Sequence, residues 1–191
     1  MKNVASFLAL VVFLALNGSL AAEAQKRFDV KPFGLMSSQG TAKLSLGQSQ
    51  EEAVKALGPP SQTDMVFSEV NRRKLVVYHY NANKLYFLDD VFVTFELHDN
   101  TLVFGKSIEE AFSVGAKIIV DGKVTTTEGH YLVNNTPLDD LKVNNKPGKC
   151  ANIQYNRIAS SYTKYGDVKT DGLFQMLFDS NNKVIYIALR D

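Results

Sequence analysis

The chain has 191 residues, and 45% of them are hydrophobic, which indicates a packed globular protein and excludes an intrinsically disordered chain. Its 21 basic and 20 acidic side chains leave a formal net charge of +1, so the sequence lacks the basic excess typical of nucleic-acid-binding proteins. A single cysteine, Cys150, excludes an intramolecular disulfide, so the fold must depend on its hydrophobic core. We interpret Cys150 as a shielded thiol without a role; the alternative is a reactive thiol or a bond to a partner.

The N-terminus has the three parts of a secretory signal peptide. Lys2 provides the positive charge, residues 4–16 are almost wholly apolar, and Ala22-Glu23-Ala24 has the small-x-small pattern of a cleavage site. We therefore expect residues 1–24 to be removed and the mature protein to be exported, periplasmic or secreted. The alternative is an uncleaved membrane anchor, which needs about 20 apolar residues, more than this run has. No cysteine lies near the cleavage site and no later apolar run is as long as a membrane span, so we expect neither a lipid anchor nor a transmembrane segment.

The first element predicted after the signal is a short helix over 49–57. Residues 25–43, which precede it, mix charged residues with glycine and serine, so we expect an irregular N-terminal arm there. Ser49 is the expected N-cap, Glu52 would complete a capping box, and Gly58-Pro59-Pro60 would end the helix. The helix is therefore short but well delimited.

Strands follow, because β-branched and aromatic residues dominate 65–70, 75–80, 85–88 and 91–97. Alternation in the last of these segments places Phe92, Thr94 and Glu96 on one face. Val91, Val93, Phe95 and Leu97 would form the other face, toward the core. Residues 98–101 read as a turn, after which 102–104 would return as the hairpin partner of 91–97.

The same signals predict the elements of the second half. They are a capped helix over 107–112, a hairpin of 117–120 and 123–127 around Asp121-Gly122, a short helix over 136–141, a linker at 144–149, and strands over 153–162, 173–178 and 184–189, the last two forming a hairpin. In the final strand we expect Ile185, Ile187 and Leu189 in the core, with Val184, Tyr186 and Ala188 facing outward.

The two halves of the mature chain resemble one another, since each places a short helix before a hairpin. This pattern indicates a degenerate tandem repeat or the ordinary likeness of two antiparallel hairpins. We divide the chain into a first helix-plus-meander unit, 44–115, and a second, more divergent unit, 116–191, which share the fold. The predicted fold class is α+β, an antiparallel sheet with short helices on one face.

Residues 46–60 (Leu-Gly-Gln-Ser-Gln-Glu-Glu-Ala-Val-Lys-Ala-Leu-Gly-Pro-Pro), then the strand 76–80 and the hairpin 91–103, resemble the opening of the BamE (SmpA/OmlA) family of small envelope proteins. The pattern is also similar to the related fold of the β-lactamase inhibitory protein, a tandem of two such units. The likeness covers about residues 44–105, with a fainter echo in 136–190. It implies a non-enzymatic protein that grips another protein with a sheet face or loops. The chain departs from both in lacking the lipidation cysteine of the first and the disulfides of the second.

Groups that could carry chemistry are scattered. His79, His98 and His130 have no metal-ligand spacing, and the sequence has no nucleophile elbow, phosphate-binding loop or dinucleotide-binding fingerprint. We interpret His98-Asp99 as part of a turn, and the carboxylate pairs Asp89-Asp90 and Asp139-Asp140 as solvated turn residues rather than a cation site. We therefore predict no catalytic, cofactor-binding or metal-ligating residue and no cofactor.

The residues expected to face outward from the sheet form a candidate partner-binding face, because exposed aromatic and polar residues are typical of protein interfaces. They are Tyr78, Tyr80, Phe92, Glu96 and Tyr186. A second layer covering this face is the alternative. We expect a non-enzymatic binding module, an envelope-assembly accessory or an inhibitor or immunity-like factor, whose partner is another envelope or secreted protein. The alternatives are a carrier of a small apolar ligand and a small hydrolase with a site around His98, Asp99 or Cys150.

Overall fold

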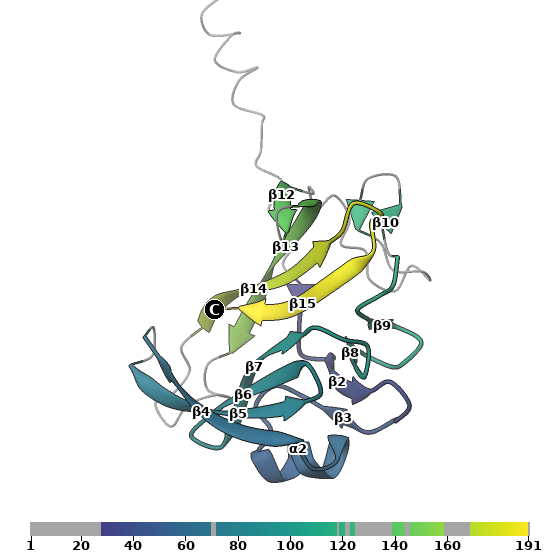
Figure 1. The fold of residues 1–191 in the computed structure, drawn as a ribbon. Coiled ribbons are helices and arrows are strands. Elements are labelled where there is room, and N and C mark those ends of the chain that lie inside the picture. The colour runs from purple at the N-terminus through teal and green to yellow at the C-terminus, as the bar shows by residue number, and fades with distance from the viewer. Residues whose placement is uncertain are drawn as a thin grey trace, which may run out of the picture.

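The structure, a computed structural model, describes residues 28–69, 72–117, 119–120, 123–124, 139–143, 146–158 and 169–190. In this part of the chain there are fifteen strands and one helix, α2 (Gln50–Leu57) (Figure 1). The α+β prediction is therefore wrong, and the fold is predominantly β. The predicted signal peptide, residues 1–24, lies outside the described residues.

Nine strands form one large sheet. In order they are β1 (Phe28–Asp29), β13 (Lys146–Ile158), β14 (Lys169–Phe178), β15 (Val184–Arg190), β7 (Val91–Leu97), β6 (Asn83–Leu88), β5 (Arg73–Tyr80) and β4 (Gln62–Ser68), while β12 (Asp139–Val143) also pairs with β13. Neighbours are antiparallel except β1 and β13. The C-terminal hairpin β14–β15 is thus joined to β7 in one continuous sheet, which ends at β4.

A smaller sheet packs against one face of the large sheet. Its order is β3 (Lys43–Leu44), β2 (Gly34–Ser37), β8 (Leu102–Gly105) and β9 (Ala111–Phe112). The arm expected at 25–43 therefore contains strands in its described part, and Leu35 of β2 is fully buried. The remaining described strands, β10 (Ile119–Val120) and β11 (Lys123–Val124), pair antiparallel, as expected within the hairpin predicted over 117–120 and 123–127. The predicted turn, Asp121-Gly122, and residues 118 and 125–127 lie outside the described residues.

The predicted partner of β7 is wrong, because 102–104 leaves the large sheet and pairs with β2 and β9 as β8. The buried side chain of Asn83 fixes this change of sheet. Its Oδ1 accepts hydrogen bonds from the backbone N–H groups of His98 (2.8 Å) and Asp99 (3.1 Å). Its Nδ2 donates to Asp99 Oδ1 (2.7 Å) and Thr101 Oγ1 (2.9 Å). This corner ends β7 and directs the chain into the small sheet, which leaves the place beside β7 for β15.

The helix predicted over 49–57 is confirmed as α2. Ser49 Oγ accepts from the backbone N–H of Glu52 (3.2 Å), and the Glu52 carboxylate accepts from the backbone N–H of Ser49 (2.8 Å), so the capping box is complete. The helix predicted over 107–112 is wrong, because residues 111–112 of this segment form strand β9, where Phe112 is fully buried. Burial of that ring in the core overrides the local helix signal.

Two further predictions around β12 and β13 need correction. Of the helix expected over 136–141, residues 139–141 lie in strand β12 and the others lie outside the described residues. The linker expected at 144–149 is wrong, because 146–149 begin β13, the longest strand of the described chain. Val143 lies opposite Lys146, so β12 and β13 are antiparallel neighbours in one sheet, and residues 144–145 lie outside the described residues.

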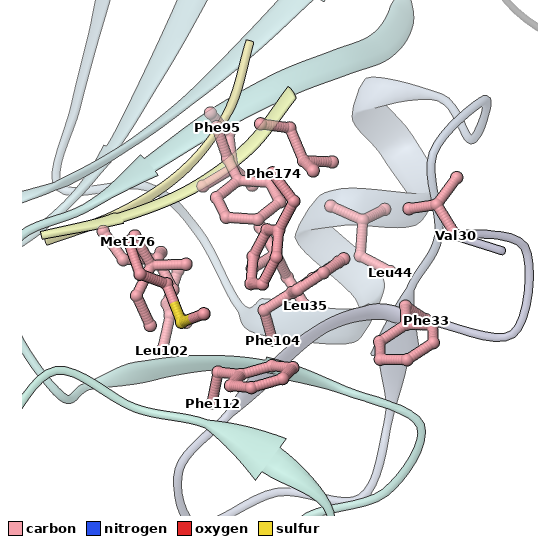
Figure 2. Packing of buried hydrophobic residues seen from close by; sticks show 14 of the residues in the cluster. Val30, Phe33, Leu35, Leu44, Phe95, Leu102, Phe104, Phe112, Phe174 and Met176 are labelled. Atoms are coloured by element: carbon pink, nitrogen blue, oxygen red, sulfur yellow. The ribbon is translucent and has the colours of Figure 1, made fainter. Parts of the chain in front are cut away.

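The core lies between the two sheets and is built largely of phenylalanine rings. Figure 2 shows Phe95 and Phe174 of the large sheet facing Phe104 and Phe112 of the small sheet. The ring centroids are 4.8 Å apart for Phe95 and Phe104, 5.4 Å for Phe104 and Phe174, and 5.2 Å for Phe112 and Phe174. We call the face of the large sheet that contributes to this core the inner face, and the opposite one the outer face.

Candidate protein-binding face

The five residues predicted to form one partner-binding face divide between the two faces of the large sheet. Phe92 is 1% exposed and belongs to the core, so the expectation that it faces outward is wrong. The reason is a β-bulge: Tyr86 lies opposite Thr94 but Phe87 lies opposite Phe92, so Val93 is an extra residue in β7. The extra residue shifts the alternation and places Phe92 on the same face as Phe95.

Tyr78 and Tyr80 also lie on the inner face, where they join β5 to α2. The Tyr78 hydroxyl donates to Gln50 Oε1 (2.9 Å), and the Tyr80 hydroxyl donates to the Gly58 carbonyl (2.9 Å). Burial, and to a smaller extent the neighbouring Tyr78, raises the pKa of Tyr80 to about 12. The Tyr80 phenol therefore remains protonated, and the hydroxyls of both tyrosines attach β5 to the helix and its C-terminal end.

Glu96 and Tyr186 are brought together on the outer face. Ala188 of β15 lies opposite Glu96 of β7, and Tyr186 precedes it by two residues on the same face. Arg190, two residues after Ala188, adds a guanidinium whose Nη2 donates to the Tyr186 hydroxyl (2.6 Å). Glu96, Tyr186 and Arg190, together with the neighbouring Tyr86 and His98, form what we call the Glu96 cluster.

The electrostatics of the cluster are centred on the Glu96 carboxylate. Arg190 Nη2 lies 3.8 Å from Glu96 Oε1, and His98 Nε2 lies 3.6 Å from Glu96 Oε2. Burial first, and then the negative charge of Glu96, raises the pKa of Tyr186 to about 12 and holds that of Tyr86 well above its ordinary range. Both phenols are therefore protonated at neutral pH and act as hydrogen-bond donors rather than bases.

A band of mostly polar residues crosses the outer face through the cluster. Gln175 Nε2 donates to Asn152 Oδ1 (2.9 Å), and Gln175 Oε1 accepts from Arg190 Nε (3.1 Å). The pairing registers place seven residues in one row across seven strands: Asn152, Gln175, Ala188, Glu96, Lys84, His79 and Gln62. The outer face therefore offers hydrogen-bonding groups over most of the sheet width.

The structure does not bring together the residues of the alternative hydrolase site. The Asp99 carboxylate accepts hydrogen bonds from Ala82, Asn83 and Thr101 and so belongs to the corner that ends β7. Cys150 is buried in β13, three strand spacings from β7, a separation of about 14 Å.

Within the described ranges, no group of three or more His, Cys, Asp or Glu side chains could hold a metal ion. The one helix described there is too short and too polar to span a membrane.

Sequence reasoning missed three members of the cluster, Tyr86, His98 and Arg190. The period-2 spacing of Tyr186, Ala188 and Arg190 is a usable signal, because it places all three on one face of a strand.

Sequence reasoning also missed the exposure of β4, where Met65, Val66 and Phe67 are 68%, 41% and 56% exposed. Three consecutive apolar residues in a strand cannot all face one core, which is the signal for that feature.

Comparisons with protein-family models, curated proteins and solved structures found no match to this chain. The resemblance of residues 44–105 to the BamE family therefore remains a prediction from the sequence pattern. The functional interpretation rests on the residues of the outer face themselves.

Proposed function

We propose that this chain is an exported, non-enzymatic protein-binding module, and that the Glu96 cluster contacts its partner, another envelope or secreted protein. The observation that supports this most directly is the Arg190 side chain, which is 49% exposed yet held in place by Gln175 and Tyr186. Tyrosine and arginine are the residues most enriched at the energetic centres of protein interfaces. Export is supported by the signal-peptide pattern of residues 1–24.

A binding role fits the protonation of the two phenols of the cluster, Tyr86 and Tyr186, better than a catalytic one. The pKa of Tyr186 is about 12 and that of Tyr86 is also raised, so neither phenol can accept a proton near neutral pH. General acid–base catalysis needs groups whose pKa lies near the working pH. The two phenols instead hold the Glu96 carboxylate in place, which keeps the surface rigid.

The orientation of Arg190 indicates the chemistry of the partner. Its hydrogen bonds use Nε and Nη2, so the other N–H groups of the guanidinium are left for a partner. A guanidinium already fixed in one orientation loses little conformational entropy on binding. Its planar fork matches a carboxylate through two parallel hydrogen bonds. We therefore expect the partner to present an aspartate or glutamate to Arg190.

The test begins by crosslinking the full tagged chain in cells, purifying it and identifying the captured protein by mass spectrometry. The affinity of the purified pair is then compared for wild type, Arg190→Ala, Arg190→Lys and Lys142→Ala. Lys142 is an exposed cation on β12 and serves as the control for lost charge. Arg190→Ala is expected to weaken binding about 30-fold or more, as for an interface hot spot of about 2 kcal/mol.

Arg190→Lys should recover only part of the affinity, because an ammonium cannot make the two parallel bonds. Lys142→Ala should stay within about twofold of wild type, as expected for a charge at the rim of an interface or outside it. The proposal fails if folded Arg190→Ala, checked by circular dichroism, binds the captured protein as tightly as wild type. It also fails if no protein is enriched over an unrelated tagged control.

A further inference from the structure

The strand β4 is an unprotected edge of the large sheet. It lies at one end of the sheet order and, among the described strands, pairs only with β5. Its seven residues, Gln-Thr-Asp-Met-Val-Phe-Ser, include no proline and no lysine and have a single charge, Asp64. Proteins usually block such edges with charge, proline or a covering element, because exposed backbone N–H and C=O groups can pair with another strand. Figure 1 shows the β4–β5 hairpin extending from the sheet with β4 outermost.

The exposed apolar residues of β4 lie on both faces of the strand. Met65 lies opposite Val76 on the inner face, and Val66 lies opposite Leu75 on the outer face. Phe67, two residues after Met65, shares its face. A ligand bound to one face would leave the other exposed, whereas a strand added along the edge would pack against all three residues and satisfy the backbone groups as well.

We propose that β4 pairs antiparallel with β4 of a second copy of this chain, in the register that places Val66 opposite itself. This register places Met65 opposite Phe67 of the second copy, so that all three apolar residues meet apolar partners. Asp64 then lies opposite Ser68 of the second copy, a carboxylate beside a hydroxyl. A parallel arrangement would instead align the two Asp64 side chains, and like charges in that position are destabilising.

The self-complementary pattern explains why a second copy fits the edge. A two-fold axis through Val66 makes the same patch serve both sides, which is the commonest arrangement of homodimers. Arg73, which lies opposite Ser68 at the end of the hairpin, is already paired with Asp89 (2.7 Å). The contact involves few residues compared with the roughly 20–30 a side of a standard interface. The dimer is therefore expected to be reversible and to depend on protein concentration.

Cysteine crosslinking tests the register. Residues directly opposite in an antiparallel pair have Cα atoms about 4.5–5.5 Å apart, within the range of a disulfide. Val66→Cys should therefore form a covalent dimer under mild oxidation, whereas Met65→Cys alone should do so much more slowly. A mixture of Met65→Cys and Phe67→Cys should form the mixed dimer. Wild type, with only the buried Cys150, is the background.

Light scattering after size-exclusion chromatography tests whether the chain dimerises without a covalent crosslink. The mass of wild type should rise toward that of a dimer with concentration, and Val66→Lys should remain a monomer. Val54→Lys is the matched control, since Val54 is 37% exposed on α2 and lies outside the edge, and it should dimerise like wild type. The proposal is overturned if wild type stays monomeric at the highest soluble concentration, if Val66→Cys crosslinks no faster than wild type, or if Met65→Cys crosslinks to itself faster than Val66→Cys.

Discussion

Replacing Asn83 by alanine should destabilise the fold more than any other change of a polar side chain in the described part of the chain. Asn83 is fully buried and makes four hydrogen bonds at the corner where the chain leaves β7. Asn83→Ala removes the acceptor for the backbone N–H groups of His98 and Asp99, and it removes the donor to Asp99 and Thr101. The corner would then lose the interactions that direct the chain into the small sheet.

The size of the effect follows from the two orphaned N–H groups. Each buried donor left without an acceptor costs about 1–3 kcal/mol. His98 is exposed, so water reaches part of this corner and the lower part of the summed range applies. We expect Asn83→Ala to lower the free energy of unfolding by about 2–4 kcal/mol. For a domain of this size the corresponding fall in Tm is about 5–15 °C.

Asn83→Asp tests the direction in which the free energy of unfolding changes with pH. In wild type, hydrogen bonds from Thr101, Ala82 and Asn83 outweigh burial, the largest single influence and opposite in direction, so the pKa of Asp99 lies below its ordinary value. Its contribution to stability is present above the pKa of the unfolded chain, about 3.9, and is lost as the pH falls through the folded value. Asn83→Asp places a second carboxylate where Nδ2 lay 2.7 Å from Asp99. Two carboxylates so close raise the pKa of one of them, so the variant should lose stability as the pH rises from about 4 to 7.

Urea unfolding followed by far-ultraviolet circular dichroism at pH 4 and pH 7 measures both effects. Asn100→Ala is the control, because Asn100 lies in the same turn with an exposed side chain, and it should change the free energy of unfolding by no more than about 0.5 kcal/mol. A cost below about 1 kcal/mol for Asn83→Ala would refute the role of the corner. Equal pH slopes for wild type and Asn83→Asp would refute the electrostatic reasoning.

Two further substitutions separate core packing from helix capping. Phe92→Ala removes a buried ring that packs against Phe87 and Phe95 and should lower the free energy of unfolding by about 3–5 kcal/mol, measured by urea unfolding. Ser49→Ala removes the cap of α2 and should cost about 1 kcal/mol in the same assay, with Ser49→Asp retaining most of the stability. If Phe92→Ala cost no more than Ser49→Ala, the inward placement of Phe92 would be wrong.

Local signals in the sequence located most of the regular elements of the large sheet. The capping box of Ser49 and Glu52 identified α2, and the β-branched and aromatic runs identified β4 to β7, β14 and β15. These signals depend only on neighbouring residues, which is why they are readable from one sequence. The strands of the expected N-terminal arm were missed because β1, β2 and β3 have two to four residues, too few for a period to show.

The faces of individual side chains were predicted less well. Two β-bulges account for the errors at Phe92, Val93 and Val184, whereas Tyr78 and Tyr80 lie on the inner face of β5, which pairs without a bulge. One bulge in β7 reversed the expected places of Phe92 and Val93, and a second in the pairing of β14 and β15 placed Val184 in the core instead of outside. A slip of one residue moves a side chain to the other face of a sheet. Glu96 and Tyr186 lie beyond these bulges in their strands, so both lie on the outer face as expected, although Tyr186 is only 7% exposed there.

The Glu96 cluster depends on the pairing of β15 with β7, which local sequence patterns do not predict. Glu96 and Tyr186 are ninety residues apart in the sequence. They meet because the chain leaves the large sheet after β7, at the corner held by Asn83, and β15 takes the place beside β7. The prediction of a β7–β8 hairpin would have placed residues 102–104 beside Glu96 instead. Long-range pairing is decided by how completely the two sheets bury their apolar faces, a property of the whole chain rather than of a segment.

The two proposed surfaces lie on one sheet and are related by its geometry. Residues directly opposite in an antiparallel pair point to the same side, so a β4–β4 dimer would present the outer faces of both copies, and both Glu96 clusters, in one direction. A partner fixed on a surface would then be bound twice, with a gain in avidity that requires no new contact. Arg190→Ala weakens each contact, whereas Val66→Lys leaves each contact intact and removes only the second one. The two variants therefore separate the binding face from the dimer edge: a soluble monomeric partner is sensitive to the first change alone, and a surface-bound partner is sensitive to both.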